Sequence, residues 1–381
     1  MGVNRVNILK GSIYLFISLT VSLSVSSQSS ILDNRELDSL VMAIATPIYN
    51  LHHDEAIKQI DALAKRIPHH PIIDMLYAMN IMWETMPDPE PENFTEIEAY
   101  LLQTISKADQ ILETNGNDPE AVFFLLMAHG LLGQYYHEQG STFKAIGEAK
   151  RVYNAVISGF SLKEEYIEFY FSTGLYNYYR EKYPILYPIY KPFVWIFRSG
   201  NIEEGLNQLH YATRNTILSK VESARYLAYI YLRYEAEPAK AYDLLAPLVS
   251  LYPRNLYFHT LLLEALMMMQ KLDEATYSIS YLIVSDNWFY RMNGLTFTGI
   301  LEEKNNNNPA YAKTYYSRAV ALGEMHKNEG MHAKSLAYAG LARISDLENN
   351  VSMAKKYYKK AAKLAQTKAV RKESAAYLKN H

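Results

Sequence analysis

The sequence predicts an all-α protein, an α-solenoid of about seven or eight stacked antiparallel helix hairpins. Three observations predict this class. Apolar residues keep helical spacing from Leu32 to His381, turn-forming residues interrupt them regularly, and one pattern of small and bulky residues repeats along the chain. A composition of 49% hydrophobic and 20% charged residues supplies a core and excludes a disordered chain. A formal net charge of −2 gives no reason to expect a nucleic-acid partner.

The N-terminal stretch predicts a signal peptide over residues 1–27. Arg5 and Lys10 precede an apolar run, and a small, polar sequence follows up to Ser27. The alternative is an uncleaved membrane anchor, but the run covers ~15 residues where a spanning helix needs ~20. We therefore expect cleavage, with residues 28–381 forming the repeat domain of an exported protein. The periplasm is the favoured destination; secretion and outer-membrane association are the alternatives.

The chain has no cysteine, which limits its chemistry. An exported chain without cysteine has no disulfides, so packing must stabilise it. Lipoprotein modification, a thiol nucleophile and a thiolate metal site are excluded as well. The most apolar later stretch, residues 185–197, is short and contains Pro188 and Pro192, so no transmembrane span is expected after signal cleavage.

Turn signals divide the remaining chain into successive helices. Clusters of proline, glycine and asparagine fall at residues 68–71, 87–91, 115–119, 140, 184–192, 200, 238, 253, 305–309, 330 and 349–350. The segments between them are roughly 12 to 20 residues long, the usual length of helices in globular proteins.

A repeated pattern marks the second helix of each expected pair: a small residue, a bulky one four positions later, and an apolar one three positions after that. The sets are Ala56/Ile60/Leu63, Gly205/Leu209/Ala212, Ala241/Leu245/Leu248, Ala275/Ile279/Leu282, Ala312/Tyr316/Ala319 and Ala354/Tyr358/Ala361, with weaker versions at Leu101/Ile105/Ala108 and Ala145/Ala149/Val152. From Gly205 on, they recur every 34 to 42 residues. The small residue allows two helices to approach closely, and the bulky one fills the groove between neighbouring hairpins. A single hairpin cannot bury its apolar face, so several must stack.

These segments resemble the second helix of the tetratricopeptide (TPR) repeat superfamily. The resemblance lies in DEAIKQIDALAKRIPHHP at residues 54–71, PAKAYDLLAPLVSLYPRN at residues 238–255 and SMAKKYYKKAAKLA at residues 352–365. It implies a right-handed superhelix that binds a protein or peptide on its concave face.

The first helices carry the resemblance less fully. Gly174 and Gly340 stand where that superfamily places a small contact residue, and Ile44, Ala228, Leu263 and Ile300 depart from it. The middle stretch, with GLYNYY and SGNIEEGLNQL, is similar to a subset of exported bacterial repeat proteins. It is more faintly similar to a eukaryotic repeat family linked to inclusion-body clearance.

Tyrosines suggest where a partner would bind. The chain has 33, of which eight lie between Tyr166 and Tyr190. Tyrosine suits either a wet groove or a contact between helices, and adjacent residues such as Tyr178 and Tyr179 cannot both face one core. The candidate partner-binding residues are Tyr170, Gly174, Tyr176, Asn177, Tyr178, Tyr179, Arg180 and Trp195. Packing around an unusually long connection is the competing interpretation. That connection, a proline-rich link at about residues 181–199, is expected to be stiff.

Other polar features predict little chemistry. The histidine pairs are His52 with His53, His69 with His70, and His326 with His332. Adjacent histidines on a helix point in different directions and chelate a metal poorly, so these residues are expected in turns and on the surface. The basic C-terminal stretch from Val351 is expected to be a solvated cap, with contact to an anionic envelope surface as the alternative. The sequence contains no GxSxG, Walker, dinucleotide-binding, HExxH or EF-hand motif. We expect no enzyme, no cofactor and no metal site.

The sequence leaves three hypotheses about function. The leading hypothesis is a non-catalytic scaffold in the cell envelope that grips a protein or peptide. The alternative is an oligosaccharide-binding component of an outer-membrane uptake system, which exposed aromatic residues would suit. An enzyme of unrecognised type is third, because no constellation of residues supports it.

Overall fold

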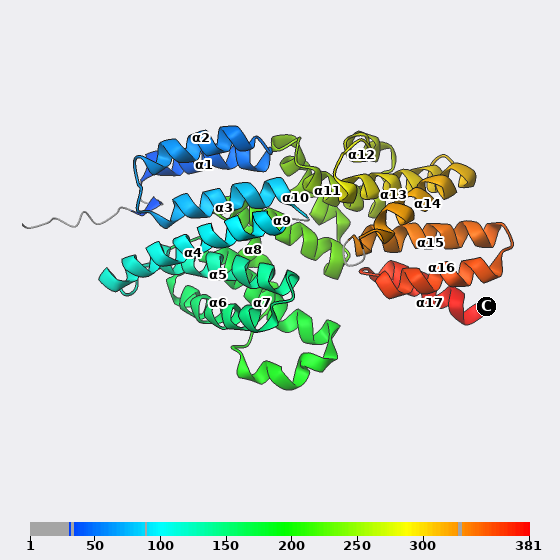
Figure 1. Cartoon of the computed structure of the whole chain (residues 1–381). Helices are drawn as coiled ribbons and strands as arrows, with labels where there is room; N and C mark the ends of the chain where they lie inside the picture. Colours follow the sequence, from blue (N-terminus) through cyan, green and yellow to red (C-terminus); the bar gives the residue numbers. More distant parts are fainter. Residues whose placement is uncertain (1–29, 32–33, 88–89, 327–329) are drawn as a thin grey trace, which may run out of the picture.

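The structure is a computed structural model and describes residues 30–31, 34–87, 90–326 and 330–381; the expected signal peptide lies outside these residues. Every regular element in this described part is helical. Sixteen helices form eight antiparallel pairs, and a seventeenth closes the C-terminal end (Figure 1). The predicted all-α class, with about seven or eight helix pairs, is therefore confirmed.

The pairs follow one another along the chain. The first helices are α1 (Arg35–Tyr49), α3 (Pro71–Thr85), α5 (Pro119–Glu138), α7 (Phe169–Leu186), α9 (Lys220–Ile230), α11 (Leu256–Met268), α13 (Trp288–Lys304) and α15 (Met331–Leu347). The second helices are α2 (His53–Ala64), α4 (Pro91–Thr114), α6 (Thr142–Leu162), α8 (Ile202–Asn215), α10 (Pro238–Leu251), α12 (Thr276–Ile283), α14 (Pro309–Glu324) and α16 (Val351–Leu364). The short elements are η2 (Pro188–Ile196), η3 (Tyr231–Glu235) and η4 (Asp273–Ala275), and α17 (Lys368–Asn380) is the last helix.

Helix starts follow from the turn residues. Side chains such as Asn34, Asn201 and Asn350 accept hydrogen bonds from the first backbone amides of their helices. This bonding satisfies donors that a helix leaves without a partner. Proline stands at the first position of α3, α4, α5, α10 and α14, where its missing amide costs nothing.

The repeated residue sets make the helix contacts they predict. All six strong sets are buried, from Ala56 on α2 to Ala361 on α16. At the α7–α8 crossing, two glycines face each other. A Cβ on Gly205 would stand 2.8 Å from the carbonyl oxygen of Gly174 and 2.6 Å from the amide nitrogen of Tyr178. The two backbones therefore touch at a distance that only glycine allows.

One weaker set was assigned wrongly. Ala149 on α6 is exposed, and the buried residues of this helix are Val156 and Gly159. A Cβ on Gly159 would stand 2.5 Å from the ring of Phe169. The close contact of α6 thus lies near its C-terminal end, because the bulky Phe169 at the start of α7 packs there.

A tyrosine ring fills the groove between the last hairpins. Tyr316 on α14 is fully buried, and Cβ atoms added to Gly299 on α13 and Gly340 on α15 would both meet its ring. Its hydroxyl donates to Glu303 at 2.7 Å. Arg343 bonds Glu303 and Glu373 at 2.5 Å and 2.7 Å, which ties α13, α15 and α17 together.

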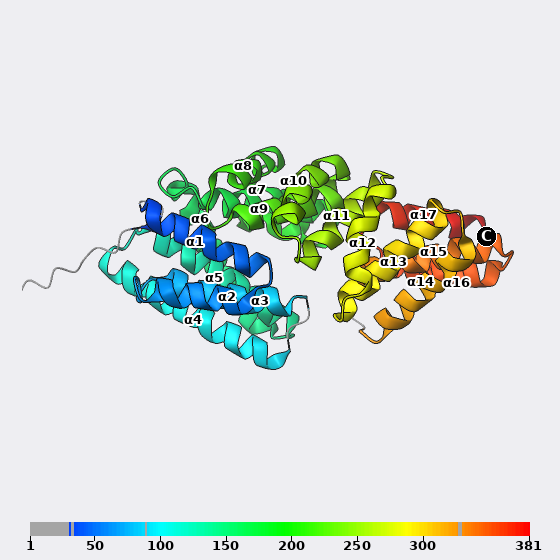
Figure 2. The same ribbon diagram turned by 90° about the horizontal axis from the view of Figure 1, so that it is seen from above.

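The proline-rich link forms a separate arm. Helix α7 continues through Pro184 to Leu186, and η2 then begins at Pro188. The arm, residues 182–199, extends beyond the stacked helices as the green segment at the bottom of Figure 1. Viewed from above, the helices from α12 onward form a second lobe beside the first (Figure 2).

Candidate functional site

A cavity of about 590 Å³ opens on the inner side of the N-terminal lobe. Its lining comes mainly from the first helices α1, α3, α5, α7 and α9, with α6 and α11 adding residues. We call this cavity the inner groove. The inner groove lies on the concave face of the solenoid. That face is the one on which the sequence predicts partner binding.

The inner groove exists because the first helix pair returns to meet the fifth and sixth. The side-chain amide of Asn50, after α1, donates to the carbonyl of Leu251 at 3.2 Å. The side-chain amide of Asn255 donates to the carbonyl of Tyr49 at 3.0 Å. The rings of Tyr49 and Tyr252 lie 5.3 Å apart. These contacts join segments about two hundred residues apart and close the lobe around the cavity.

The lining of the inner groove is mostly apolar and rich in methionine. Met75, Met79, Met82 and Met86 recur along α3 and just beyond it at helical spacing, and Met127 faces them from α5. All but Met75 are only partly buried, so their side chains reach the cavity. Methionine is flexible and polarisable, which suits it to apolar partners of varied shape.

One ion pair interrupts the apolar lining. Arg225 and Glu222 on α9 lie 2.6 Å apart, and Tyr49 donates to Glu222 at 3.2 Å. The guanidinium of Arg225 lies 4.1 Å from the centre of the Tyr226 ring. Burial opposes the charge on Arg225, but Glu222 and the neighbouring Tyr226 and Tyr257 outweigh it, so the pKa of Arg225 is raised. Because each charge has its partner within the lining, this part of the groove is electrically balanced.

Three of the predicted partner-binding residues pack between helices. Gly174 forms the α7–α8 contact. Asn177 is buried and donates to Gln208 at 3.0 Å. Tyr178 is fully buried and donates to Glu235 at 2.5 Å.

Two others line the inner groove. Tyr176 and Tyr179 both border the cavity and are partly exposed. The hydroxyl of Tyr176 donates to the carbonyl of Arg198 at 2.6 Å. Tyr179 packs against Tyr234 with ring centres 5.9 Å apart. Burial, together with neighbouring tyrosines, raises the pKa of Tyr179 further above physiological pH, so its hydroxyl stays protonated as a hydrogen-bond donor.

The remaining candidates lie away from the cavity. Arg180 donates to the carbonyl of Val194 at 2.7 Å and to that of Arg198 at 3.2 Å, and so holds the arm. Trp195 on the arm is 78% exposed. Tyr170 borders a different hollow, between α8 and the start of α7. The structure thus distributes the eight predicted residues over four places.

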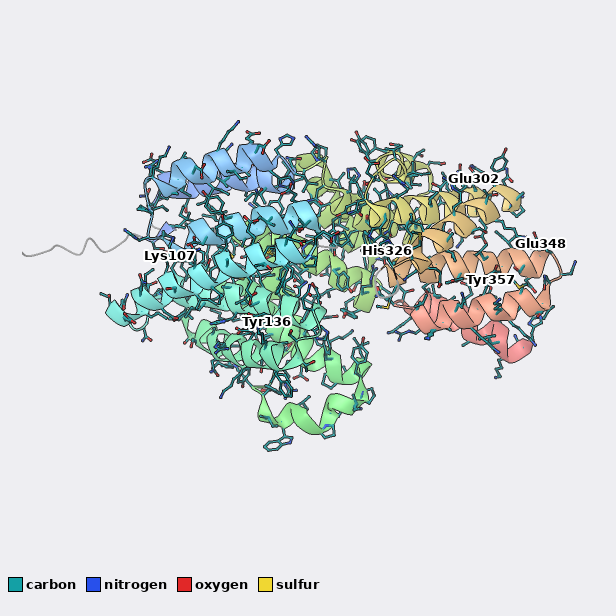
Figure 3. The ribbon with its side chains drawn as sticks, in the orientation of Figure 1. Lys107, Tyr136, Glu302, His326, Glu348 and Tyr357 are labelled. Atoms are coloured by element: carbon teal, nitrogen blue, oxygen red, sulfur yellow. The ribbon has the colours of Figure 1, made fainter. Side chains whose placement is uncertain are left out.

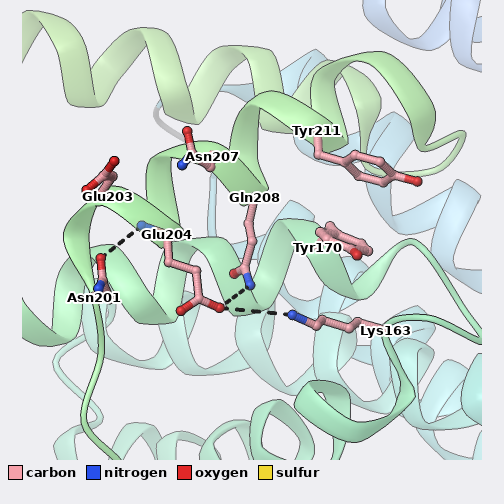
Figure 4. Close-up of a pocket in the computed structure, with 8 residues that line it drawn as sticks. All are labelled: Lys163, Tyr170, Asn201, Glu203, Glu204, Asn207, Gln208 and Tyr211. Atoms are coloured by element: carbon pink, nitrogen blue, oxygen red, sulfur yellow. Dashed lines mark hydrogen bonds and ion pairs between the residues drawn. The ribbon is translucent and has the colours of Figure 1, made fainter.

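That second hollow, of about 470 Å³, is lined by polar and charged residues, and we call it the polar hollow (Figure 4). Glu204 bonds Gln208 at 2.9 Å and lies 4.0 Å from Lys163. Beside them, the rings of Tyr170 and Tyr211 pack against each other, with centres 4.3 Å apart. The ring faces that would hold a sugar therefore partly cover one another.

The residues that dominate the inner groove were not singled out from the sequence. The methionines of α3 follow the spacing of any core helix, and Glu222 and Arg225 look like an ordinary pair one turn apart. A usable signal was the density of methionine on one helix face, because a packed core uses this residue sparingly.

The histidine prediction was partly wrong. His70 is buried, caps α3 through the amide of Ile72 and contacts Glu120 at 3.3 Å. His332 is held 3.1 Å from Glu264 in a buried cluster with Arg233. Burial and Arg233 lower the pKa of His332 well below its usual value. By contrast, His326, which is labelled in Figure 3, is only partly buried. Its ring stacks on that of Trp288, with centres 3.7 Å apart. Within the described residues, no three histidine or acidic side chains are grouped to hold a metal.

Comparison with known proteins supplies structural neighbours only. No family model matches the sequence, and no curated protein matches it. Among solved structures, the apo form of the quorum sensor NprR from B. thuringiensis is 13% identical, covering 86% of this chain and 87% of its own, with a TM-score of 0.39. A human IFIT1 dimer with PPP-AAAA is 13% identical, covering 86% and 94%, with a TM-score of 0.36. The P58(IPK) TPR domain is 13% identical, covering 92% and 99%, with a TM-score of 0.24.

The fold assignment stands on the chain's own geometry. Helix pairs follow one another in order, and small residues of the repeated sets are buried where neighbouring helices meet. No described helix is both long enough and apolar enough to cross a bilayer. With these repeated contacts between successive helix pairs, the chain has an α-solenoid fold of stacked antiparallel helix hairpins.

Proposed function

We propose that this chain is a non-catalytic binding protein that takes an apolar segment of a protein or peptide partner into its inner groove. The observation that carries the proposal is the cavity itself: about 590 Å³, lined by inner helices and bordered by flexible methionines. Concave sites with an apolar lining and few polar groups are the usual form of ligand pockets. The balanced Glu222–Arg225 pair favours an uncharged apolar segment over a charged one.

The other partner classes fit less well. An oligosaccharide would need exposed aromatic faces and free polar groups, but the polar hollow already pairs Tyr170 with Tyr211 and Glu204 with Gln208. A nucleic acid would need a cationic surface, which an apolar groove and a formal net charge of −2 do not favour. A catalytic role would need convergent polar groups in the cavity, and its central charges are already paired with each other.

Filling the groove tests this function. No atom outside α5 lies within 4 Å of a Cβ added at Gly130, which borders the cavity. Gly130→Phe should therefore occupy the groove without disturbing the helix. The neutral fluorophore N-phenyl-1-naphthylamine should bind the unaltered chain, and its affinity should fall by about tenfold or more in the variant, because apolar surface is no longer available. Fluorescence titration gives both affinities.

Gly147→Phe on α6 is the matched control, because Gly147 does not border the cavity. A photo-reactive residue at Met79 should cross-link one defined polypeptide in the producing cells, and Gly130→Phe should abolish that product. Equal fluorophore binding by the two phenylalanine variants would contradict the assignment of the groove.

We further propose that the chain acts outside the cytoplasm, in the cell envelope. The pattern of residues 1–27 supports this proposal. Mass spectrometry of the protein from fractionated cells should find a new N-terminus close to Gln28 in the exported fraction. An intact N-terminus in the cytosol would exclude export.

A further inference from the structure

The arm exposes an unusual concentration of large apolar side chains. Those exposed by 44% to 78% within fifteen consecutive positions are Tyr183, Ile185, Tyr187, Ile189, Trp195, Ile196 and Phe197. Isolated exposed apolar residues are ordinary, but a contiguous set marks a surface that meets something other than water. In Figure 3 the arm lies below the stacked helices, with side chains projecting away from them.

The exposure does not come from a loose segment, because the base of the arm is fixed by the helices beside it. Arg180 on α7 donates to two arm carbonyls, those of Val194 and Arg198. The amide of Arg198 donates to the hydroxyl of Tyr153 on α6 at 3.1 Å. The guanidinium of Arg198 lies 3.9 Å from the centre of the Phe160 ring. The apolar side chains are thus presented outward by a fixed frame.

The geometry of the arm favours contact with the interfacial layer of a membrane over contact with the surface of a folded protein. Successive residues of a 3₁₀-helix point about 120° apart. Trp195 and Ile196, the last two residues of η2, are both exposed and therefore point in different directions. Phe197 follows η2 and packs against the Tyr153 ring, with ring centres 5.2 Å apart. A protein partner would cover one side of such a protrusion. The interfacial layer of a membrane can surround it, and tryptophan and tyrosine are the residues enriched at that layer.

The positive charge of the arm favours a membrane with anionic lipids. Between Glu181 and Glu203 the chain has Lys182, Lys191 and Arg198 and no acidic residue. Lys182 is paired with Glu235 at 2.7 Å, so the exposed cations of the arm are Lys191 and Arg198. Lys191 is exposed, within the apolar set. Cations beside an apolar protrusion strengthen attachment to anionic lipids. We propose that the arm is a membrane-surface anchor, which inserts its apolar side chains into the headgroup region of an anionic bilayer and holds the repeat domain there.

Vesicle binding tests the anchor with the full chain. Vesicles of phosphatidylglycerol and phosphatidylethanolamine supply the anionic surface, and phosphatidylcholine vesicles supply a neutral one. The emission of Trp195, obtained as the difference between the unaltered chain and Trp195→Phe, should shift to the blue with the anionic vesicles and lose intensity to brominated lipid. Residues 1–29 contain no tryptophan, so they cannot produce this signal.

Arm variants supply the quantitative result. Ile189→Ser with Ile196→Ser should lower the partition coefficient on anionic vesicles by about tenfold or more, because two large apolar side chains are removed from the contact. Lys191→Glu should weaken binding to anionic vesicles alone. The control is Val284→Ser with Leu347→Ser, which removes two apolar side chains that are 74% and 70% exposed elsewhere. All these positions are exposed, so thermal unfolding should not change.

Three results would overturn the proposal. The first is an unchanged Trp195 emission with anionic vesicles. The second is equal partitioning of the arm variant and the control. The third is a lipid-free dimer that the arm substitutions convert to a monomer, which would identify the arm as an interface between copies.

Discussion

Gly205→Ala is expected to lower the free energy of unfolding by about 3 kcal/mol, near the upper end of the usual effect of overpacking. The new methyl group would stand 2.6 Å from the amide nitrogen of Tyr178 and 2.8 Å from the carbonyl oxygen of Gly174. Both are backbone atoms of α7, so no side chain can rotate away and the two helices must separate. Separation would also strain the hydrogen bond between Asn177 and Gln208. Urea unfolding followed by circular dichroism at 222 nm measures the change.

A glycine-to-alanine substitution at Gly147 should change the free energy of unfolding in the opposite direction. A Cβ on Gly147 would have its nearest neighbour at 3.6 Å, the guanidinium of Arg151, which is an ordinary contact. Gly147→Ala on α6 is therefore expected to raise the free energy of unfolding by about 0.5–1 kcal/mol through helix propensity. If Gly205→Ala matched this control, the close approach of α7 and α8 would not exist.

Glu168→Ala is expected to cost about 3–5 kcal/mol of unfolding free energy, because one buried carboxylate holds a whole turn. Glu168 is fully buried just before α7 and accepts from the amides of Ile217, Leu218 and Ser219 at 2.7, 3.1 and 2.8 Å. It also accepts from the hydroxyl of Ser219 at 2.5 Å. Burial raises the pKa of Glu168, and these hydrogen bonds partly counteract the rise. Alanine would leave all four donors without this acceptor.

Two related variants separate this role from a general effect of charge. Glu165→Ala removes an exposed carboxylate three residues earlier and should change the free energy of unfolding by no more than about 0.5 kcal/mol. Glu168→Gln keeps one acceptor oxygen, so its change in the free energy of unfolding should lie between those of Glu168→Ala and Glu165→Ala. Similar urea midpoints for Glu168→Ala and Glu165→Ala would show that the turn at residues 217–219 is held by something else.

The fold could be predicted from the sequence because its contacts are local. Each set such as Ala241/Leu245/Leu248 lies on one helix face and contacts the adjacent helices, so spacing along the chain translates directly into packing. The prediction failed on α6, where the weaker set Ala145/Ala149/Val152 puts the small contact residue at Ala145, while Gly159 makes a closer contact near the end of the helix. Only the ring of Phe169, from the next helix, decides between them.

The candidate site could be predicted only in part. Tyr176 and Tyr179, two of the predicted partner-binding residues, border the inner groove. Tyr178, which was also predicted, is instead buried between helices. The spacing of the methionines on α3 gave no distinct signal, because a core helix and a cavity wall share the same periodicity. Only the density of methionine on one helix face set this helix apart. The methionines line a cavity because Asn50 and Tyr49 contact residues at the end of α10 and the start of α11, which closes the lobe. These contacts join residues about two hundred positions apart, and no local sequence pattern encodes them.

That closing contact also changes how the chain must fold. An open repeat array folds by adding neighbours, and any unit can begin the process. Here the amide of Asn255 and the carbonyl of Tyr49 are 206 positions apart in sequence. During synthesis from the N-terminus, α1 leaves the ribosome long before its partner has been translated. The first lobe therefore has the late, long-range step of a globular domain, whereas the second lobe can assemble one hairpin at a time.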